Sequence, residues 1–190
     1  PRMIATPYTT KETEPSWGEA RKAGWGAEIS GNYCTGLIEL AFTLNDNELI
    51  AKAEKWVNEV LSYQREDGYL ETYTETDDFF DDYNAWGTGC GMNALLAYYE
   101  ATGREDVLNA VYRCMLWFCN NWAGNKKTRY AGVSITECMA KCYRYTGDKR
   151  LIDFCEDYYT FLRDNDLFDI SLEAMLSERL HYNSHHGAGY

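Results

Sequence analysis

The chain has 190 residues, of which 45% are hydrophobic and 25% are charged, a composition that supports one globular domain with a buried core. Its 18 basic and 30 acidic residues leave a net charge of −12, and so acidic a surface repels phosphate backbones and anionic lipid head groups. We therefore expect no nucleic-acid partner and no membrane partner, and we favour a neutral substrate.

The chain is expected to open with an irregular segment over residues 1–27. A helix rich in small residues and poor in charged ones follows around Gly31–Ala41. Asn45 can take the left-handed conformation that closes a helix, and Asp46 can cap the helix that comes next. That next helix is amphipathic, because its apolar residues recur every three or four positions, as Leu49, Ala53, Trp56, Val57, Val60 and Leu61.

The same layout of small-residue helix, polar turn and amphipathic helix occurs twice more. The second copy has its first helix around Gly89–Ala97 and its turn at Gly103, and the third has them around Ser134–Cys142 and at Gly147. The amphipathic helices that follow carry apolar residues at Val107, Leu108, Val111, Met115, Phe118 and Trp122, and at Leu151, Phe154, Cys155, Tyr158, Tyr159 and Leu162. The turns are each followed by an acidic residue suited to a helix start, as Asp46, Asp106 and Asp148.

Alternation of these two kinds of helix predicts two layers. A helix that is apolar on most faces is surrounded by protein, whereas an amphipathic helix lies at the surface. Repeated hairpins of this kind are typical of helical repeat architectures, and no period-two pattern predicts a strand. We predict an all-α fold of helical hairpin repeats forming part of an α/α toroid, of which the chain supplies about three and a half hairpins.

Three polar loops lead into the small-residue helices, over residues 64–87, 128–137 and 180–190, and we expect them to converge on one mouth. Each mixes carboxylates, aromatic rings and glycines. Rings can stack on the C–H faces of sugars, carboxylates or imidazoles can bind hydroxyls, and a pair of acids can cleave a glycosidic bond. This combination favours a carbohydrate site at the mouth.

The candidate binding residues in these loops each have a structural alternative. Asp82 is the preferred acid of the first loop because Tyr83 and Trp86 follow it, although that loop could be a solvated acidic stretch with a helix cap. Glu137 lies near the start of a nearly uncharged helix, where it could cap the helix or face the axis of the ring. His185 and His186 are adjacent, so they point to different sides in regular structure.

Most of the seven cysteines are interpreted as small apolar residues of a reducing compartment, which favours a cytoplasmic location. No signal peptide is visible at the start of the sequence. No Cys-x-x-Cys spacing occurs, so no metal site is expected within these residues.

Several stretches together resemble one known family. They are residues 61–70 (LSYQREDGYL), the Asp82-Tyr83-Asn84 loop, and the turns at Gly103 and Gly147, and the most specific of them is the Gln-x-x-Asp-Gly-Tyr-Leu segment at residues 64–70. They are similar to the beta-L-arabinofuranosidase family (glycoside hydrolase family 127) and its less characterised relatives, over roughly residues 30–190.

The resemblance implies an (α/α)6 barrel, of which residues 1–190 form a single, incomplete catalytic-type domain, and exo-cleavage of plant-type arabinose glycosides. It also implies substrate-pocket roles for Tyr69, Asp82, Tyr83 and the His185–His186 segment.

The chain departs from the family at one position, because Gly89-Cys90 stands where the family often has a Gly-His pair. The family's usual catalytic centre, a zinc-bound cysteine nucleophile with glutamate partners, matches no motif here. We therefore assign no catalytic residue and expect no cofactor within this chain, and zinc is left open for a full-length protein.

The favoured function is a glycoside hydrolase acting on an oligosaccharide or glycoside, such as a beta-L-arabinofuranoside. A sugar epimerase or an unsaturated-uronide hydrolase on the same toroid is an alternative, although the uronide enzyme needs a basic pocket and the loops offer mainly Arg65 and Arg129. A non-catalytic module that binds carbohydrate or protein is the other alternative. The partner expected for an exposed inner surface is the remainder of the toroid or a second copy of the chain.

Overall fold

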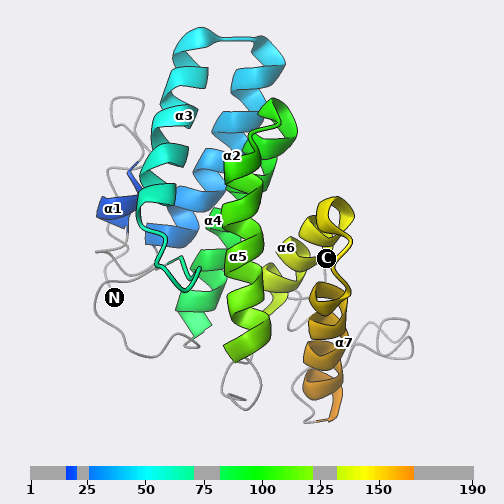
Figure 1. The fold of residues 1–190 in the computed structure, drawn as a ribbon. Coiled ribbons are helices and arrows are strands. Elements are labelled where there is room, and N and C mark those ends of the chain that lie inside the picture. The colour runs from blue at the N-terminus through cyan, green and yellow to red at the C-terminus, as the bar shows by residue number, and fades with distance from the viewer. Residues whose placement is uncertain (1–15, 21–25, 71–81, 122–131, 165–190) are drawn as a thin grey trace, which may run out of the picture.

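The computed structural model describes residues 16–20, 26–70, 82–121 and 132–164, and within these ranges it contains seven helices (Figure 1). They are α1 (Trp17–Ala20), α2 (Gly26–Leu44), α3 (Asn47–Ser62), α4 (Asp82–Thr102), α5 (Glu105–Asn121), α6 (Gly132–Thr146) and α7 (Lys149–Asp164). The extended pairing in these ranges amounts to one isolated bridge, between Gln64 and Leu70. The all-α prediction is therefore confirmed. None of the described helices is both long enough and apolar enough to cross a membrane.

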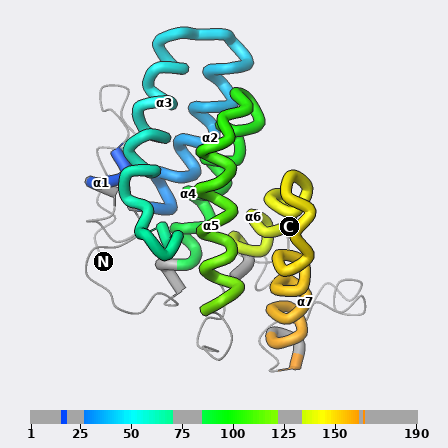
Figure 2. The backbone as a smooth tube through the Cα atoms, viewed as in Figure 1, coloured from blue at the N-terminus to red at the C-terminus, as the bar shows by residue number. Residues whose placement is uncertain are grey.

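The long helices form three successive hairpins, α2–α3, α4–α5 and α6–α7, arranged in two layers (Figure 2). In the first layer α4 packs against α2 on one side and against α6 on the other. In the second layer α3, α5 and α7 each pack on the helix that precedes them in the chain. This is the predicted alternation of inner and outer helices, laid out as an arc of a toroid.

The turns between the two helices of each hairpin have the predicted chemistry. Asn45, Gly103 and Gly147 have φ angles of 52°, 70° and 67°, in the left-handed region that closes a helix. Asp46 caps α3 by accepting hydrogen bonds from the backbone N–H groups of its second and third residues, at 2.9 and 3.2 Å. Asp148 accepts from the N–H of Arg150 at the start of α7, at 3.0 Å.

The inner helices approach one another closely where they carry glycine. A Cβ atom on Gly31 of α2 would lie 2.6 Å from the backbone carbonyl carbon of Cys90 in α4. A Cβ atom on Gly89 of α4 would lie 2.8 Å from the carbonyl carbon of Ser134 in α6. Both separations are shorter than packed atoms allow, so the small residues of the inner helices are required by their contact.

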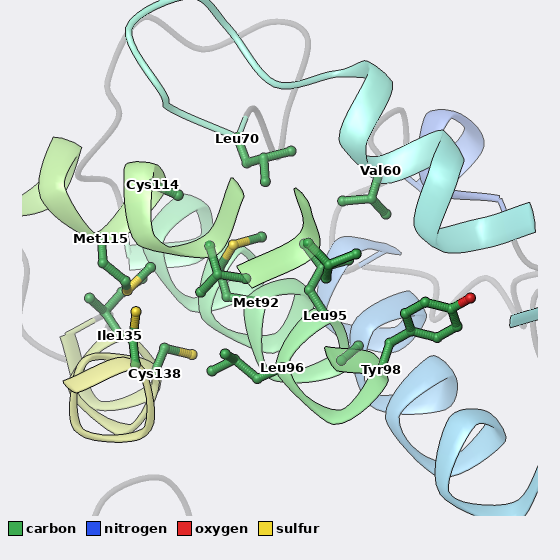
Figure 3. Close-up of a cluster of buried hydrophobic side chains, with 14 of the residues drawn as sticks. Val60, Leu70, Met92, Leu95, Leu96, Tyr98, Cys114, Met115, Ile135 and Cys138 are labelled. Atoms are coloured by element: carbon green, nitrogen blue, oxygen red, sulfur yellow. The ribbon is translucent and has the colours of Figure 1, made fainter. Parts of the chain in front are cut away.

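The hydrophobic core lies between the two layers (Figure 3). The inner helix α4 is its centre, because Met92, Leu95 and Leu96 are at most 1% exposed. Side chains from the neighbouring helices complete it, as Val60, Cys114, Met115, Ile135 and Cys138. Burial of apolar surface contributes about 25 cal/mol per Å², so the packing between the two layers is the main source of stability.

Two described parts of the N-terminal segment are helical. Residues 1–27 were expected to be irregular, yet residues 17–20 form α1 and α2 already begins at Gly26. The start of α1 is capped by the Glu59 carboxylate of α3, which accepts hydrogen bonds from the backbone N–H of Trp17 at 3.2 Å and of Gly18 at 2.9 Å. The Trp17 side chain is fully buried. Because this cap comes from a residue about forty positions away, the local sequence contains no sign of it.

We expect Gly31→Ala to lower the free energy of unfolding by about 1–3 kcal/mol, because α2 must move away from α4. The matched control is Gly36→Ala on the same helix, where an added Cβ meets no atom within 4 Å. That control should raise the free energy of unfolding by about 0.5–1 kcal/mol, since alanine favours the helix over glycine. Urea unfolding measures both, and equal effects of the two substitutions would contradict the close-approach interpretation.

Candidate functional site

The segment 64–70, which the family resemblance singles out most strongly, is attached to the outer helix α5. The Gln64 amide donates hydrogen bonds to the carbonyl oxygens of Gly68, at 2.8 Å, and of Ala110 in α5, at 2.7 Å. The Arg113 guanidinium of α5 donates to the carbonyl oxygen of Glu66 at 2.8 Å. Gly68 has a φ of 96° and no room for a side chain against the carbonyl oxygen of Arg113. The segment thus forms a tight turn seated on α5.

Tyr69 lies in this turn and packs against α5. Its ring centroid is 4.4 Å from that of Trp117 and 6.0 Å from that of Phe118, and the residue is 1% exposed. Asp67 closes the turn by accepting hydrogen bonds from the Tyr69 N–H and from the indole N–H of Trp117, both at 3.1 Å. Tyr69 therefore packs against the outer layer, and its predicted contact with a substrate stays a prediction.

A polar triangle joins the inner helices α4 and α6. The Lys141 ammonium donates to Glu137 Oε1 at 2.7 Å and to Asn93 Oδ1 at 3.1 Å. The Asn93 amide in turn donates to Glu137 Oε2 at 3.2 Å. The side chains of Glu137 and Lys141 are 33% and 37% exposed, so the triangle is open to a ligand on one side.

The predicted residue Trp86 lies on the same side of α4 as this triangle. Residues 86, 90 and 93 recur at helical spacing, and Trp86 and Asn93 are both partly exposed. The Ser134 hydroxyl of α6 donates to the Trp86 carbonyl oxygen at 3.2 Å, which fixes this turn of α4 against α6. We call the surface made by Trp86, Cys90, Asn93, Glu137 and Lys141 the inner face.

The negative charges of two carboxylates act on Cys90 of the inner face. Cys90 is 5% exposed, and burial, followed by the negative charges of Glu28 in α2 and Glu137 in α6, raises the pKa of its thiol to about 12. The thiol therefore keeps its proton at neutral pH and is a poor nucleophile there. Charges from both neighbouring inner helices, α2 and α6, thus act on this residue of α4.

An open groove of about 520 Å³ adjoins the inner face, between α6 and α7. Glu137 and Lys141 stand at its edge, and its other lining residues are Thr136, Ala140, Arg144, Ile152, Cys155 and Tyr159. Its volume is within the range of about 300–1,000 Å³ that small-ligand sites have.

The model of the beta-L-arabinofuranosidase, glycoside hydrolase family 127, catalytic domain matches residues 5–181. The chain belongs to this family. It is therefore a glycoside hydrolase domain, and its substrate is a carbohydrate. No curated protein and no solved structure matches the chain.

The structure brings only some of the predicted site residues together. Trp86 and Glu137 share the inner face. Asp82 and Tyr83 are the first residues of α4, where the first loop enters the inner layer, although their side chains are outside the described part of the structure. His185 and His186 also lie outside the described residues.

Sequence analysis missed Glu28, Asn93 and Lys141. Two of them leave a signal in the sequence: Asn93 is seven residues after Trp86, and Lys141 is four residues after Glu137, so each shares a helix face with a predicted residue. Nothing in the sequence relates the position of Glu28 to that of Cys90, because they come from different helices.

The described residues contain no set of ligands that fits the zinc implied by the resemblance. No three His, Cys, Asp or Glu side chains converge there as a metal ion requires. Burial also raises the pKa of Cys114 to about 12, as it does for Cys90, so these thiols are held in the protonated form, which binds metal poorly.

We expect the raised thiol pKa values to make stability fall in alkaline solution. A thiol with an ordinary pKa of 9.0 in the unfolded chain and about 12 in the fold stabilises the protein fully below pH 9, and this contribution is lost as the pH rises toward 12. Cys90→Ala should therefore reduce the slope of unfolding free energy against pH by up to about 1.4 kcal/mol per pH unit in that window. Urea unfolding from pH 8 to pH 11 measures it, and an unchanged slope would show that Cys90 titrates normally.

Proposed function

We propose that the inner face binds the substrate of this glycoside hydrolase, and that the substrate is a plant-type glycoside such as a beta-L-arabinofuranoside. The observation that carries the proposal is the triangle of Glu137, Asn93 and Lys141 on the inner face. It places an acceptor and two kinds of donor side by side on partly exposed side chains, at the edge of a groove of about 520 Å³.

Such a triangle suits a neutral sugar. Sugar hydroxyls both donate and accept hydrogen bonds, so they can pair with the Glu137 carboxylate as acceptor and with the Asn93 amide as donor. The three side chains already contact one another, and little conformational entropy remains to be lost when a ligand binds. Trp86, on the same side of α4 and partly exposed, is proposed to supply the apolar surface for the C–H face of a sugar.

The described residues supply binding rather than bond cleavage in this proposal. Cys90 is buried and protonated, and its neighbours Glu28 and Glu137 are on different helices. We propose that Asp82, Tyr83 and the His185–His186 segment complete the pocket at the mouth. The groups that break the glycosidic bond then lie outside the described residues.

The uronide alternative needs a basic pocket, for which the loops offer mainly Arg65 and Arg129. Arg65 pairs with Asp67 at 2.9 Å in the turn that is seated on α5, so it is engaged at the outer layer. Arg129 lies outside the described residues. Lys141 is the cation of the inner face, and it is already paired with Glu137.

We expect Glu137→Gln to raise the KM for a cleaved glycoside roughly 10-fold, because a hydrogen bond from a sugar hydroxyl to a charged acceptor contributes about 1.5–3 kcal/mol. A panel of p-nitrophenyl glycosides that includes the beta-L-arabinofuranoside should be tested with the longest form of the protein that contains these residues. Glu156→Gln, an exposed position on α7, is the matched control and should leave KM unchanged.

Two results would count against this function. If no glycoside in the panel is hydrolysed, the proposed substrate class is wrong. If hydrolysis is seen but Glu137→Gln and Glu156→Gln behave alike, the enzyme acts on glycosides through a pocket that does not include the inner face.

A further inference from the structure

Lys141 differs from an ordinary surface lysine in what it contacts. Its pair with Glu137 has the i,i+4 spacing that is common on exposed helices, where such pairs contribute only about 0.3–0.5 kcal/mol. Here the ammonium also contacts Asn93 Oδ1 on the neighbouring helix, at 3.1 Å. The pair is thus part of a contact between α4 and α6.

The triangle determines the orientation of the Glu137 carboxylate. Oε1 accepts from Lys141 of α6 and Oε2 accepts from Asn93 of α4, so the two oxygens are held by donors from two helices. The amide of Asn93 has one possible orientation here, because its oxygen must face the ammonium and its nitrogen must face the carboxylate. A carboxylate has about four lone-pair sites, so about two remain for hydroxyl donors of a ligand.

Lys141 also offsets negative charge at this level of the inner face. The negative charges of Glu28 and Glu137 both act on the Cys90 thiol, and like charges repel each other. With Lys141 replaced by an apolar residue, Glu137 would lose its ionic partner and could turn toward water. The side chain of Glu137 is 33% exposed, so that movement is open to it.

We propose that Lys141 is a positioning residue, which holds the Glu137 carboxylate in the orientation that contacts the sugar. The inference rests on the proposed function, because it assigns Lys141 a role in the same binding site. Lys141 acts through Glu137, and the ammonium itself need not touch the substrate.

The test is a double-mutant cycle with the same p-nitrophenyl glycoside and the same form of the protein. Lys141→Met is expected to raise KM about 10-fold, with kcat changed much less. The expected change is that of losing Glu137 as a charged hydrogen-bond acceptor, because the carboxylate is no longer held in place. In the Glu137→Gln background, Lys141→Met should add less than about twofold, because the group it positions is already lost. Lys141→Arg should recover most of the affinity, since it restores a cation beside the carboxylate.

Lys52→Met is the matched control. Lys52 pairs with Glu48 at 3.4 Å with the same i,i+4 spacing, on the outer helix α3. It should leave KM unchanged because its ion pair lies on the outer helix α3, and thermal unfolding checks that both methionine variants are folded.

The outcomes separate this inference from the proposed function. If the wild type hydrolyses no glycoside, the proposed function fails and the role of Lys141 fails with it. If Glu137→Gln raises KM but Lys141→Met does not, Lys141 has no positioning role although the function stands. If the two effects multiply in the double variant, Lys141 contacts the substrate independently, and the inference is wrong.

Discussion

The close contact among the inner helices is the constraint on which the rest of the structure depends. Gly31 and Gly89 let α4 lie against α2 and α6 at backbone distance, and no larger residue fits there. In this packing the Asn93 amide of α4 donates to the Glu137 carboxylate of α6, at 3.2 Å. Gly89, which lets α4 approach α6, therefore also supports the inner face.

The parts of the fold that follow from local chemistry could be predicted from the sequence. Asn45, Gly103 and Gly147 are among the residue types that close helices, and Asp46 is a cap whose partners are two and three positions away. The start of α1 could not be predicted in this way. Its cap is the Glu59 carboxylate, and a contact across some forty residues exists only after α3 has packed.

The candidate site was harder to predict than the fold, because a family motif identifies relatives without giving each residue a role. The segment 64–70 carried the most specific resemblance, and Tyr69 was accordingly placed in the substrate pocket. In the structure its ring lies between the turn and α5, with Trp117 and Phe118 as neighbours. That turn needs Gly68, whose φ is 96°, and the Gln64 amide, which donates to two backbone carbonyl oxygens. The requirements of folding can therefore explain the motif without a contact to substrate.

Two ion pairs with the same spacing show why Lys141 escaped sequence analysis. Glu48–Lys52 and Glu137–Lys141 have the same four-residue spacing, yet they lie on helices of different layers. On the outer helix α3 the pair faces water, where screening leaves it little energetic value. On the inner helix α6 the neighbouring α4 supplies Asn93 as a third partner, and the pair becomes an oriented group beside a groove. The layer to which a helix belongs, more than the spacing of its charges, decides whether a pair can serve a binding site.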